Sequence, residues 1–346
     1  MASIYESVTA PAIAAYYNEK PKETAPYLLG VFFPDNKQLG TDLSYIKGAK
    51  GSVKPLSLSG YDAKAIPIGR EGFEKLTTEI PFFKNSMNIN EKQRKELLNV
   101  LQSGNQQVID MVLNKIFDDE TTLVDNAELT LELMRAQALT TGKIAFSSNG
   151  QSISFDYGVP AENKVTSDWT ATATADPLAD ITSWQDTIEA NTGVRPNALI
   201  MNSTTLNKMK KVAAIKNAIY VFGEGKVTPN TSKIVEYLAN EAGVTTYIYS
   251  KGYKNAEGTF TKFIPDDTVI LLPDMALGNT WFAPTPEETD LMTSPDVANV
   301  SVVNTGVAIT TIKETDPVNV MTKVSMNAMV SLEMANSIVI ADVSSL

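Results

Sequence analysis

Four stretches near the middle of the chain decide its fold: Leu139-Thr-Thr-Gly-Lys143, Phe155-Asp-Tyr-Gly158, Trp169 and Asp176-Pro-Leu-Ala-Asp-Ile-Thr-Ser-Trp184. Gly142 is typical of the position just after a helix, because glycine adopts the left-handed backbone at little steric cost. Asp176 followed by Pro177 predicts the start of another helix, with the carboxylate as its cap and the proline in its first turn. No residue in these stretches indicates chemistry, so their information concerns structure.

The composition describes a folded protein with little equipment for catalysis. The chain has 346 residues, of which 43% are hydrophobic and 20% charged, and this length is enough for two or more domains. It contains no His and no Cys. Disulfides, thiolate nucleophiles and the most common general base and metal ligand are therefore excluded. We expect no catalytic residue, no cofactor and no metal site.

The net charge of −11 limits the possible partners. Broad binding to nucleic acid is disfavoured, because phosphate contacts need clustered lysine and arginine. An acidic wall can still enclose DNA, since it repels DNA rather than retaining it. No apolar run of about 18 residues predicts a membrane span, and residues 1–20 lack the basic segment of a secretory signal.

The first 85 residues are predicted to contain two segments without a core of their own. Residues 1–45 are apolar without a sustained period, which favours an arm lying on other surfaces over a frayed terminus. Residues 46–85 alternate glycine, proline and charges with short β-prone runs, which predicts a long hairpin. Because a hairpin alone is marginally stable, we expect a neighbouring subunit to hold it. The predicted contact residues are Lys54, Lys64, Ile66, Ile68, Arg70, Glu71, Phe73 and Lys75.

The strongest helical pattern covers residues 90–117, where apolar side chains recur at three- and four-residue spacing. The acidic run Asp118-Asp-Glu120 follows and is interpreted as a break and a solvated helix end. It is a poor cation site, because it lacks the alternate spacing and central glycine of a calcium loop. A second helix is expected from Asp125, which opens a pattern similar to a capping box, to Gly142.

Residues 176–313 predict a mixed α/β module in which helices cover a sheet. Helices are expected to begin at Asp176, at Ser203 as a cap, and near Ser232. The strands are predicted at 198–201, 244–250, 260–264 and 268–272, with a later hairpin at 297–313. Residues 314–346 are β-prone, and their methionines are interpreted as core filling.

Two patterns that resemble chemical motifs fail. A phosphate loop at residues 220–227 would need glycine in place of Tyr220 and serine or threonine in place of Val227. Asp176 and Asp180 share a helix face and could form an acid–base pair, but Asp176 is better explained as a cap.

In their order and spacing, the stretches quoted first resemble the lambda-type major capsid protein family of tailed bacteriophages. Two further segments agree with it, Arg195-Pro-Asn-Ala-Leu-Ile-Met-Asn-Ser203 and the closing residues from Asp316 to Val343. The resemblance covers about residues 25–343 and implies an α+β fold, the Hong Kong ninety-seven capsid fold. It divides the chain into an N-terminal arm, an extended loop, a peripheral domain with a spine helix, an inserted axial domain and return strands of the peripheral domain. The corresponding ranges are 1–45, 46–85, 86–175, 176–313 and 314–346.

The resemblance also implies a function. A major capsid protein would self-assemble into hexamers and pentamers, and these into an icosahedral or prolate shell that encloses double-stranded DNA without sequence-specific binding. The implied partners are further copies of the chain, a portal and, in some shells, a decoration protein. A separate scaffolding protein is expected, because the arm and hairpin account for the residues before the spine helix. The implied location is the virion, after assembly in the host cytoplasm.

Two alternatives stay open. Another virion structural protein, such as a tail tube, would be shorter and mostly β. A cytosolic α/β enzyme would need a pocket with perturbed titratable groups, and the sequence offers no candidate.

Overall fold

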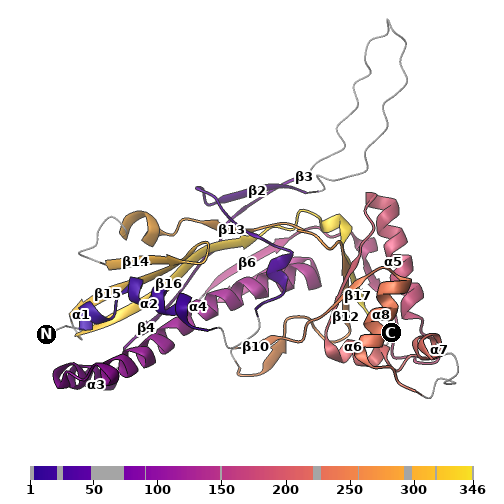
Figure 1. The fold of residues 1–346 in the computed structure, drawn as a ribbon. Helices are drawn as coiled ribbons and strands as arrows, with labels where there is room; N and C mark the ends of the chain where they lie inside the picture. Colours follow the sequence, from indigo (N-terminus) through magenta and orange to yellow (C-terminus); the bar gives the residue numbers. More distant parts are fainter. Residues whose placement is uncertain are drawn as a thin grey trace, which may run out of the picture.

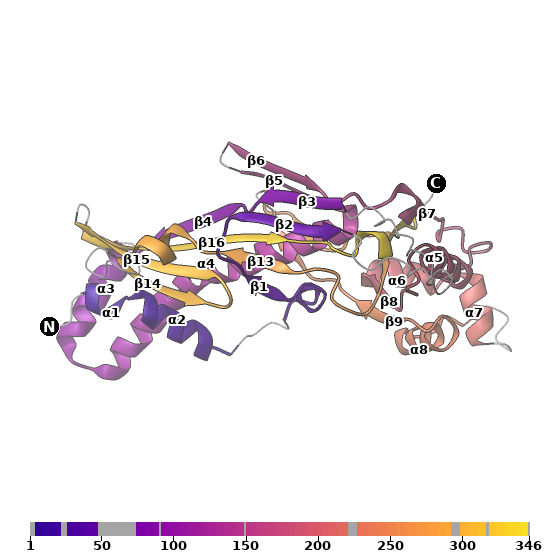
Figure 2. The ribbon, with the colours of Figure 1, turned by 90° about the horizontal axis from the view of Figure 1, so that it is seen from above.

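The computed structural model describes residues 4–21, 26–47, 74–89, 91–148, 150–220, 227–255, 257–291, 298–315 and 318–344. The molecule is elongated (Figure 1), with a long helix and a large sheet at one end and an α/β module at the other. Seen from above, α3 lies at one extreme and α5 to α8 lie at the other (Figure 2).

The spine of the molecule is helix α4 (Gln106–Thr141), a single helix of 36 residues that follows α3 (Glu91–Ser103). The two helices are separated at Gly104, whose φ of 68° is the left-handed conformation that ends a helix. The predicted break at the acidic run Asp118–Glu120 is therefore wrong. Acidic residues in a helix interior cost only a few tenths of a kcal/mol, about the spread of ordinary helix propensities, which tertiary contacts override. The predicted end at Gly142, with φ 71°, is confirmed.

Six strands form the large sheet, in the order β1-β13-β16-β15-β14, with β4 paired to β16 beside β13. Their bounds are β1 (Asp35–Lys37), β4 (Phe82–Asn88), β13 (Thr280–Ala283), β14 (Ala298–Val303), β15 (Val307–Thr315) and β16 (Val318–Val330). Only the pair β1–β13 is parallel. Helix α4 and the N-terminal helices α1 (Ile4–Ser7) and α2 (Ala10–Glu19) contact this sheet. Val124 of α4 and Val320 of β16 are both buried in the core that results.

The α/β module contains a second sheet in the order β7-β17-β12-β8-β9. Its strands are β7 (Lys164–Thr166), β8 (Ala198–Met201), β9 (Thr245–Ile248), β12 (Thr268–Leu272) and β17 (Val339–Asp342). Around it lie α5 (Pro177–Thr192), α6 (Ser203–Met209), α7 (Ala213–Ile219) and α8 (Thr231–Glu241). Strand β8 is buried throughout, as expected for a central strand covered on both faces.

Local signals in the module were mostly predictable. Strands β8 and β12 have the predicted bounds, and the Asp176 carboxylate caps α5 by accepting from Ala179 N. The predicted cap at Ser203 is wrong by one residue. Asn202 is the cap of α6, because its side-chain oxygen accepts from Thr205 N at 2.9 Å.

Three two-stranded hairpins of the described structure lie outside the two larger sheets. They are β2 (Asp42–Lys47) with β3 (Glu74–Glu79), β5 (Lys143–Ser148) with β6 (Gln151–Asp156), and β10 (Gly252–Lys254) with β11 (Phe260–Lys262). The short helical turns are Leu29–Val31, Ala161–Asn163 and Ala335–Ser337, with a π-helical turn at Glu287–Leu291. Strands β13 and β14 and most of β15 fall within residues 176–313 but pair into the large sheet. In the described part of the chain, no helix is long and apolar enough to cross a membrane.

Candidate functional site

The hairpin β2–β3, like the two other hairpins, stands outside the two larger sheets. Its strands pair with each other, Leu43 opposite Thr78, and no third described strand joins them. A hydrogen bond of 2.8 Å from Ile80 N to Thr41 O closes the base, where Leu43 and Ile80 are buried. Figure 1 shows both strands above the large sheet. The hairpin is thus anchored at its base by its own subunit.

The predicted contact residues fall almost entirely beyond this base. Lys75 lies in β3, opposite Ile46 of β2. The others lie outside the described residues, and they are Lys54, Lys64, Ile66, Ile68, Arg70, Glu71 and Phe73. Their role in assembly stays a prediction. Residues 221–226 of the rejected phosphate-loop pattern are also outside the described chain.

The N-terminal helix α2 is held by its own subunit. Ile13 is buried in the core, and the Tyr16 hydroxyl donates to Asp118 Oδ1 at 2.8 Å. Lys20 Nζ approaches the same oxygen at 2.6 Å, and the hydrogen bonds from Lys20 and Tyr16 lower the pKa of Asp118. The Tyr17 hydroxyl donates to Glu128 at 2.7 Å. This part of the arm therefore lies on the surface of its own spine helix.

Three consecutive carboxylates of α4 face three different elements. Asp118 binds α2, and Asp119 accepts from Gln93 of α3 at 2.8 Å. Glu120 is buried against β16, where Thr322 is its neighbour. Successive helical residues point about 100° apart, so one acidic run can serve three directions. The interpretation of this run as a solvated helix end is wrong, because the run lies inside α4 and Glu120 is buried.

A buried polar network joins α4 to distant segments. Glu132 accepts from Leu29 N at 3.1 Å and from the Tyr249 hydroxyl at 2.6 Å. Burial raises the pKa of Glu132. One turn later, Arg135 donates to Thr280 Oγ1 and to Asp35 Oδ1, each at 2.9 Å. The network fixes the segment before β1, strand β13 and the end of β9 to one helix. The sequence analysis did not predict this network. The available signal was the pair Glu132 and Arg135, an acidic and a basic residue three positions apart in an apolar helix.

An apolar groove of about 630 Å³ lies between β4, α4 and the β5–β6 hairpin. Leu123, Phe83, Phe146 and Met326 line it, and the two phenylalanine rings meet edge to face at 5.8 Å. Strand β4 pairs only with β16 among the described strands, and Phe82 is 40% exposed. Exposed apolar area next to an unpaired strand edge is typical of contact surfaces.

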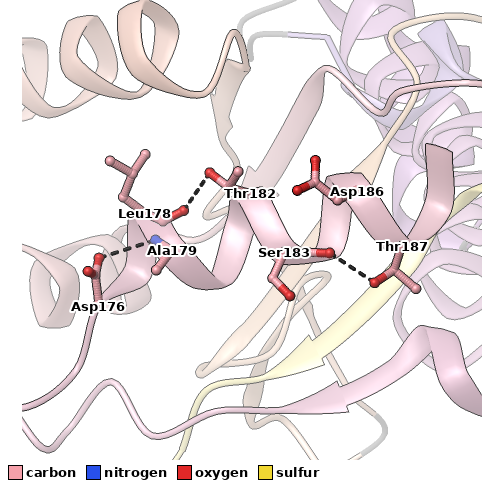
Figure 3. Close-up of a pocket in the computed structure, with 7 residues that line it drawn as sticks. All are labelled: Asp176, Leu178, Ala179, Thr182, Ser183, Asp186 and Thr187. Atoms are coloured by element: carbon pink, nitrogen blue, oxygen red, sulfur yellow. Dashed lines mark hydrogen bonds between the residues drawn. The ribbon is translucent and has the colours of Figure 1, made fainter. Parts of the chain in front are cut away.

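A surface depression of about 730 Å³ lies on α5 (Figure 3). Its two threonine side chains turn back to the helix itself, and Asp186 pairs with Arg195. Thr182 donates to Leu178 O, and Thr187 donates to Ser183 O, both at 2.9 Å. Few polar groups therefore converge on a ligand position, unlike a small-molecule site.

The carboxylate pair on α5 is divided between two structural tasks. Asp176 caps the helix, as predicted. Asp180 accepts from Ser167 at 2.6 Å and from Trp169 Nε1 at 2.8 Å. The two carboxylates bind different groups and do not act together.

Two solved structures share this architecture. The chain is similar to a candidate capsid protein from a prophage of E. coli CFT073, with 14% identity, a TM-score of 0.60 and coverage of 97% of this chain and 99% of that one. It is also similar to a phage-related protein of Bordetella bronchiseptica RB50, with 15% identity, a TM-score of 0.58 and 98% coverage of both chains. At these identities the likeness concerns the fold, which is the α+β capsid fold of tailed phages.

Residues 9–343 match the phage major capsid protein E family, and the chain belongs to this family. No protein with a curated description matches the sequence. The protein is accordingly a major capsid protein, a non-enzymatic structural component of the virion that associates with copies of itself to form the shell. The family and fold that the resemblance implied are confirmed. The two alternatives, another virion structural protein and a cytosolic enzyme, are wrong.

Proposed function

We propose that the chain forms hexamers and pentamers, and that these close into an icosahedral or prolate shell around double-stranded DNA. The observation that carries this proposal is the hairpin β2–β3, which no third described strand joins. Two-stranded hairpins are marginally stable in water, so a neighbouring copy that covers the hairpin stabilises it. Contacts between unlike surfaces of identical subunits generate closed rings.

The contact is proposed to use the charged and apolar residues of the extended loop, which are Lys54, Lys64, Ile66, Ile68, Arg70, Glu71, Phe73 and Lys75. Charges of both signs are present, which suits pairing between copies. An exposed ion pair contributes only about 0 to 1 kcal/mol, so its effect depends on repetition in every subunit.

Charge reversal at Arg70 tests the proposal. Arg70→Glu is expected to impair shell formation while the thermal unfolding of the free subunit stays nearly unchanged. Lys211→Glu is the matched control, since it reverses one charge at an exposed position of the α/β module. Shell yield is measured by sedimentation and electron microscopy. Normal shells combined with a strongly destabilised subunit would show that the loop packs on its own subunit, and the proposal would fail.

We further propose that a separate scaffolding protein, a portal and a decoration protein complete the head, and that assembly takes place in the host cytoplasm. The support is that the described residues before α4 are engaged in this subunit: α2 binds α4, β4 joins the large sheet and α3 packs on α4. The intact mass of the protein in mature shells is the test. A large N-terminal truncation would indicate a fused scaffold instead.

The proposed division into arm, extended loop, peripheral domain, axial domain and return strands follows the family pattern. Two apolar cores bear on it. One surrounds α4 and the large sheet and also takes in one face of the second sheet through Ile200 and Ile270, and the other lies around α5 to α8. Because β13, β14 and β15 pair into the large sheet, we assign them to the peripheral domain. The net charge of −11 supports enclosure of DNA without sequence-specific binding, and purified protein should not retard DNA at physiological salt.

A further inference from the structure

Glu120 occupies an unusual position for a carboxyl group, the interior of the contact between the spine helix and the large sheet. Its side chain is 2% exposed, and Thr322 of β16, which faces it, is fully buried. Thr322 stands opposite Thr311 of β15 and Met87 of β4. The carboxyl therefore points at the middle of the sheet, where three strands meet.

The hydrogen bonds at this position are incomplete. Among the described residues, neither Glu120 Oε2 nor Thr322 Oγ1 has a hydrogen-bond partner of good geometry. A carboxylate buried in this way is strongly disfavoured, so the group takes up a proton instead. Protonation removes the charge without moving the side chain.

The charged groups on α2 and β16 are engaged elsewhere. On α2, Tyr16 and Lys20 both bind Asp118. On β16, Lys323 follows Thr322 and so points to the opposite face of the sheet, where its ammonium lies 2.6 Å from Glu287 Oε1. Neither element supplies a cation to Glu120.

Helix α3 and the helix of Glu120 itself also carry charged groups. Arg94 of α3 lies one turn before the buried Leu97, which places it on the face turned toward α4. On α4, Asp119 is the neighbour whose charge acts on Glu120. That charge is negative and favours the protonated form of Glu120.

Burial raises the pKa of Glu120 to about 7; the Thr322 hydroxyl opposes this change and Asp119 adds to it. The pKa in the folded protein is thus above the ordinary value of 4.5. The stability contributed by the protonated group is fully present below pH 4.5 and is lost as the pH rises through about 7.

We propose that the contact between Glu120 and β16 is a proton-controlled joint between the spine helix and the large sheet, closed while the carboxyl carries a proton and weakened when it ionises. Because β16 also holds β4, β13 and β15, opening of the joint loosens the support of the whole sheet. A subunit built in this way responds to pH near neutrality.

Amide hydrogen exchange of the full-length protein between pH 5.5 and 8.5 tests the joint, with rates expressed as protection factors to remove the intrinsic effect of pH. Peptides covering residues 113–127 and 318–330 report on the two sides. A pKa that changes from 4.5 to about 7 predicts that their protection falls about 30-fold across this range. Glu120→Gln keeps the shape of the side chain and should remove the dependence. Constant protection in the unmodified protein, or an unchanged dependence in Glu120→Gln, overturns the proposal.

A second pair of variants decides the matter even where Glu120→Gln does not fold. Asp119→Asn removes the neighbouring charge at an exposed position and should lower the pH at which protection is lost. Asp110→Asn, also exposed on α4, is the matched control and should leave that pH unchanged. If protection is lost at the same pH in both variants, the proposal is contradicted.

Discussion

The hairpin β2–β3 and the spine helix α4 belong to one subunit, but only α4 is held from several sides. Helix α4 contacts α2, α3, the large sheet and the second sheet, and its carboxylates and Arg135 bind across these contacts. The hairpin pairs with itself, and Leu43 and Ile80, which are buried, lie at its base. We infer from this difference that the contacts of α4 stabilise the free subunit, whereas the hairpin is the part that depends on neighbouring copies. Stability of the free subunit should depend on α4, and assembly should depend on the hairpin.

Among the contacts of α4, we expect the largest loss of stability from the substitution Arg135→Leu. Glu132 is fully buried and lies 3.7 Å from Arg135 Nη1, so the substitution leaves a buried carboxyl without its cation. Removal of one partner from a buried pair costs about 3–5 kcal/mol. Urea unfolding of the free subunit should show this loss. Glu236→Ala, at an exposed position of α8, serves as the control and should change stability by less than about 0.5 kcal/mol.

Shortening the Ile13 side chain tests whether the arm packs on its own subunit in solution. Ile13 lies on α2 and is completely buried. Ile13→Ala should lower the free energy of unfolding of the free subunit by about 2–4 kcal/mol. Val31→Ala, at a side chain 68% exposed, is the control. Equal unfolding midpoints for the two variants would mean that the arm leaves its own subunit before assembly.

A matched pair of glycines separates backbone strain from crowding at the end of α4. Gly142 and Gly193 both end helices, with φ of 71° and 72°. A Cβ at Gly142 would lie 2.7 Å from Val159 Cγ2, whereas nothing lies within 4 Å at Gly193. Gly193→Ala should cost about 1 kcal/mol and Gly142→Ala about 2 kcal/mol, since only the latter must also displace a neighbour. Equal losses in thermal unfolding would remove the crowding argument.

The sequence predicted elements that depend on local signals. Strands β8 and β12 are short apolar runs, and the cap at Asp176 and the stop at Gly142 follow from backbone chemistry. The break was predicted at the acidic run, whereas α3 and α4 are separated at Gly104. An acidic run ends a helix only where solvent is its partner, and here α2, α3 and β16 take that place.

Long-range partners were beyond the sequence. Glu132 binds Leu29 and Tyr249, which are 103 and 117 residues away along the chain, and no spacing rule connects them. Glu120 shows the same limit, since only β16, about 200 residues later, makes it a buried group. The order of the quoted motifs predicted the fold where local chemistry could not, because the sequence pattern of a family reflects the tertiary contacts of its shared structure.

The smallest predicted effect concerns Asp118, the neighbour of Glu120 with the opposite pH response. Its side chain is 48% exposed, and hydrogen bonds from Lys20 and Tyr16 lower its pKa. A lowered pKa means that its contribution is present at neutral pH and is lost as the pH falls through the folded value. Asp118→Asn should therefore cost about 0 to 1 kcal/mol at pH 7 and nothing at a pH where the carboxyl is protonated in both states. Urea unfolding at pH 7 and at about pH 2.5 compares the two conditions, with Asp110→Asn as the control. A cost of several kcal/mol at pH 7 would show that α2 depends on this one carboxylate rather than on the burial of Ile13.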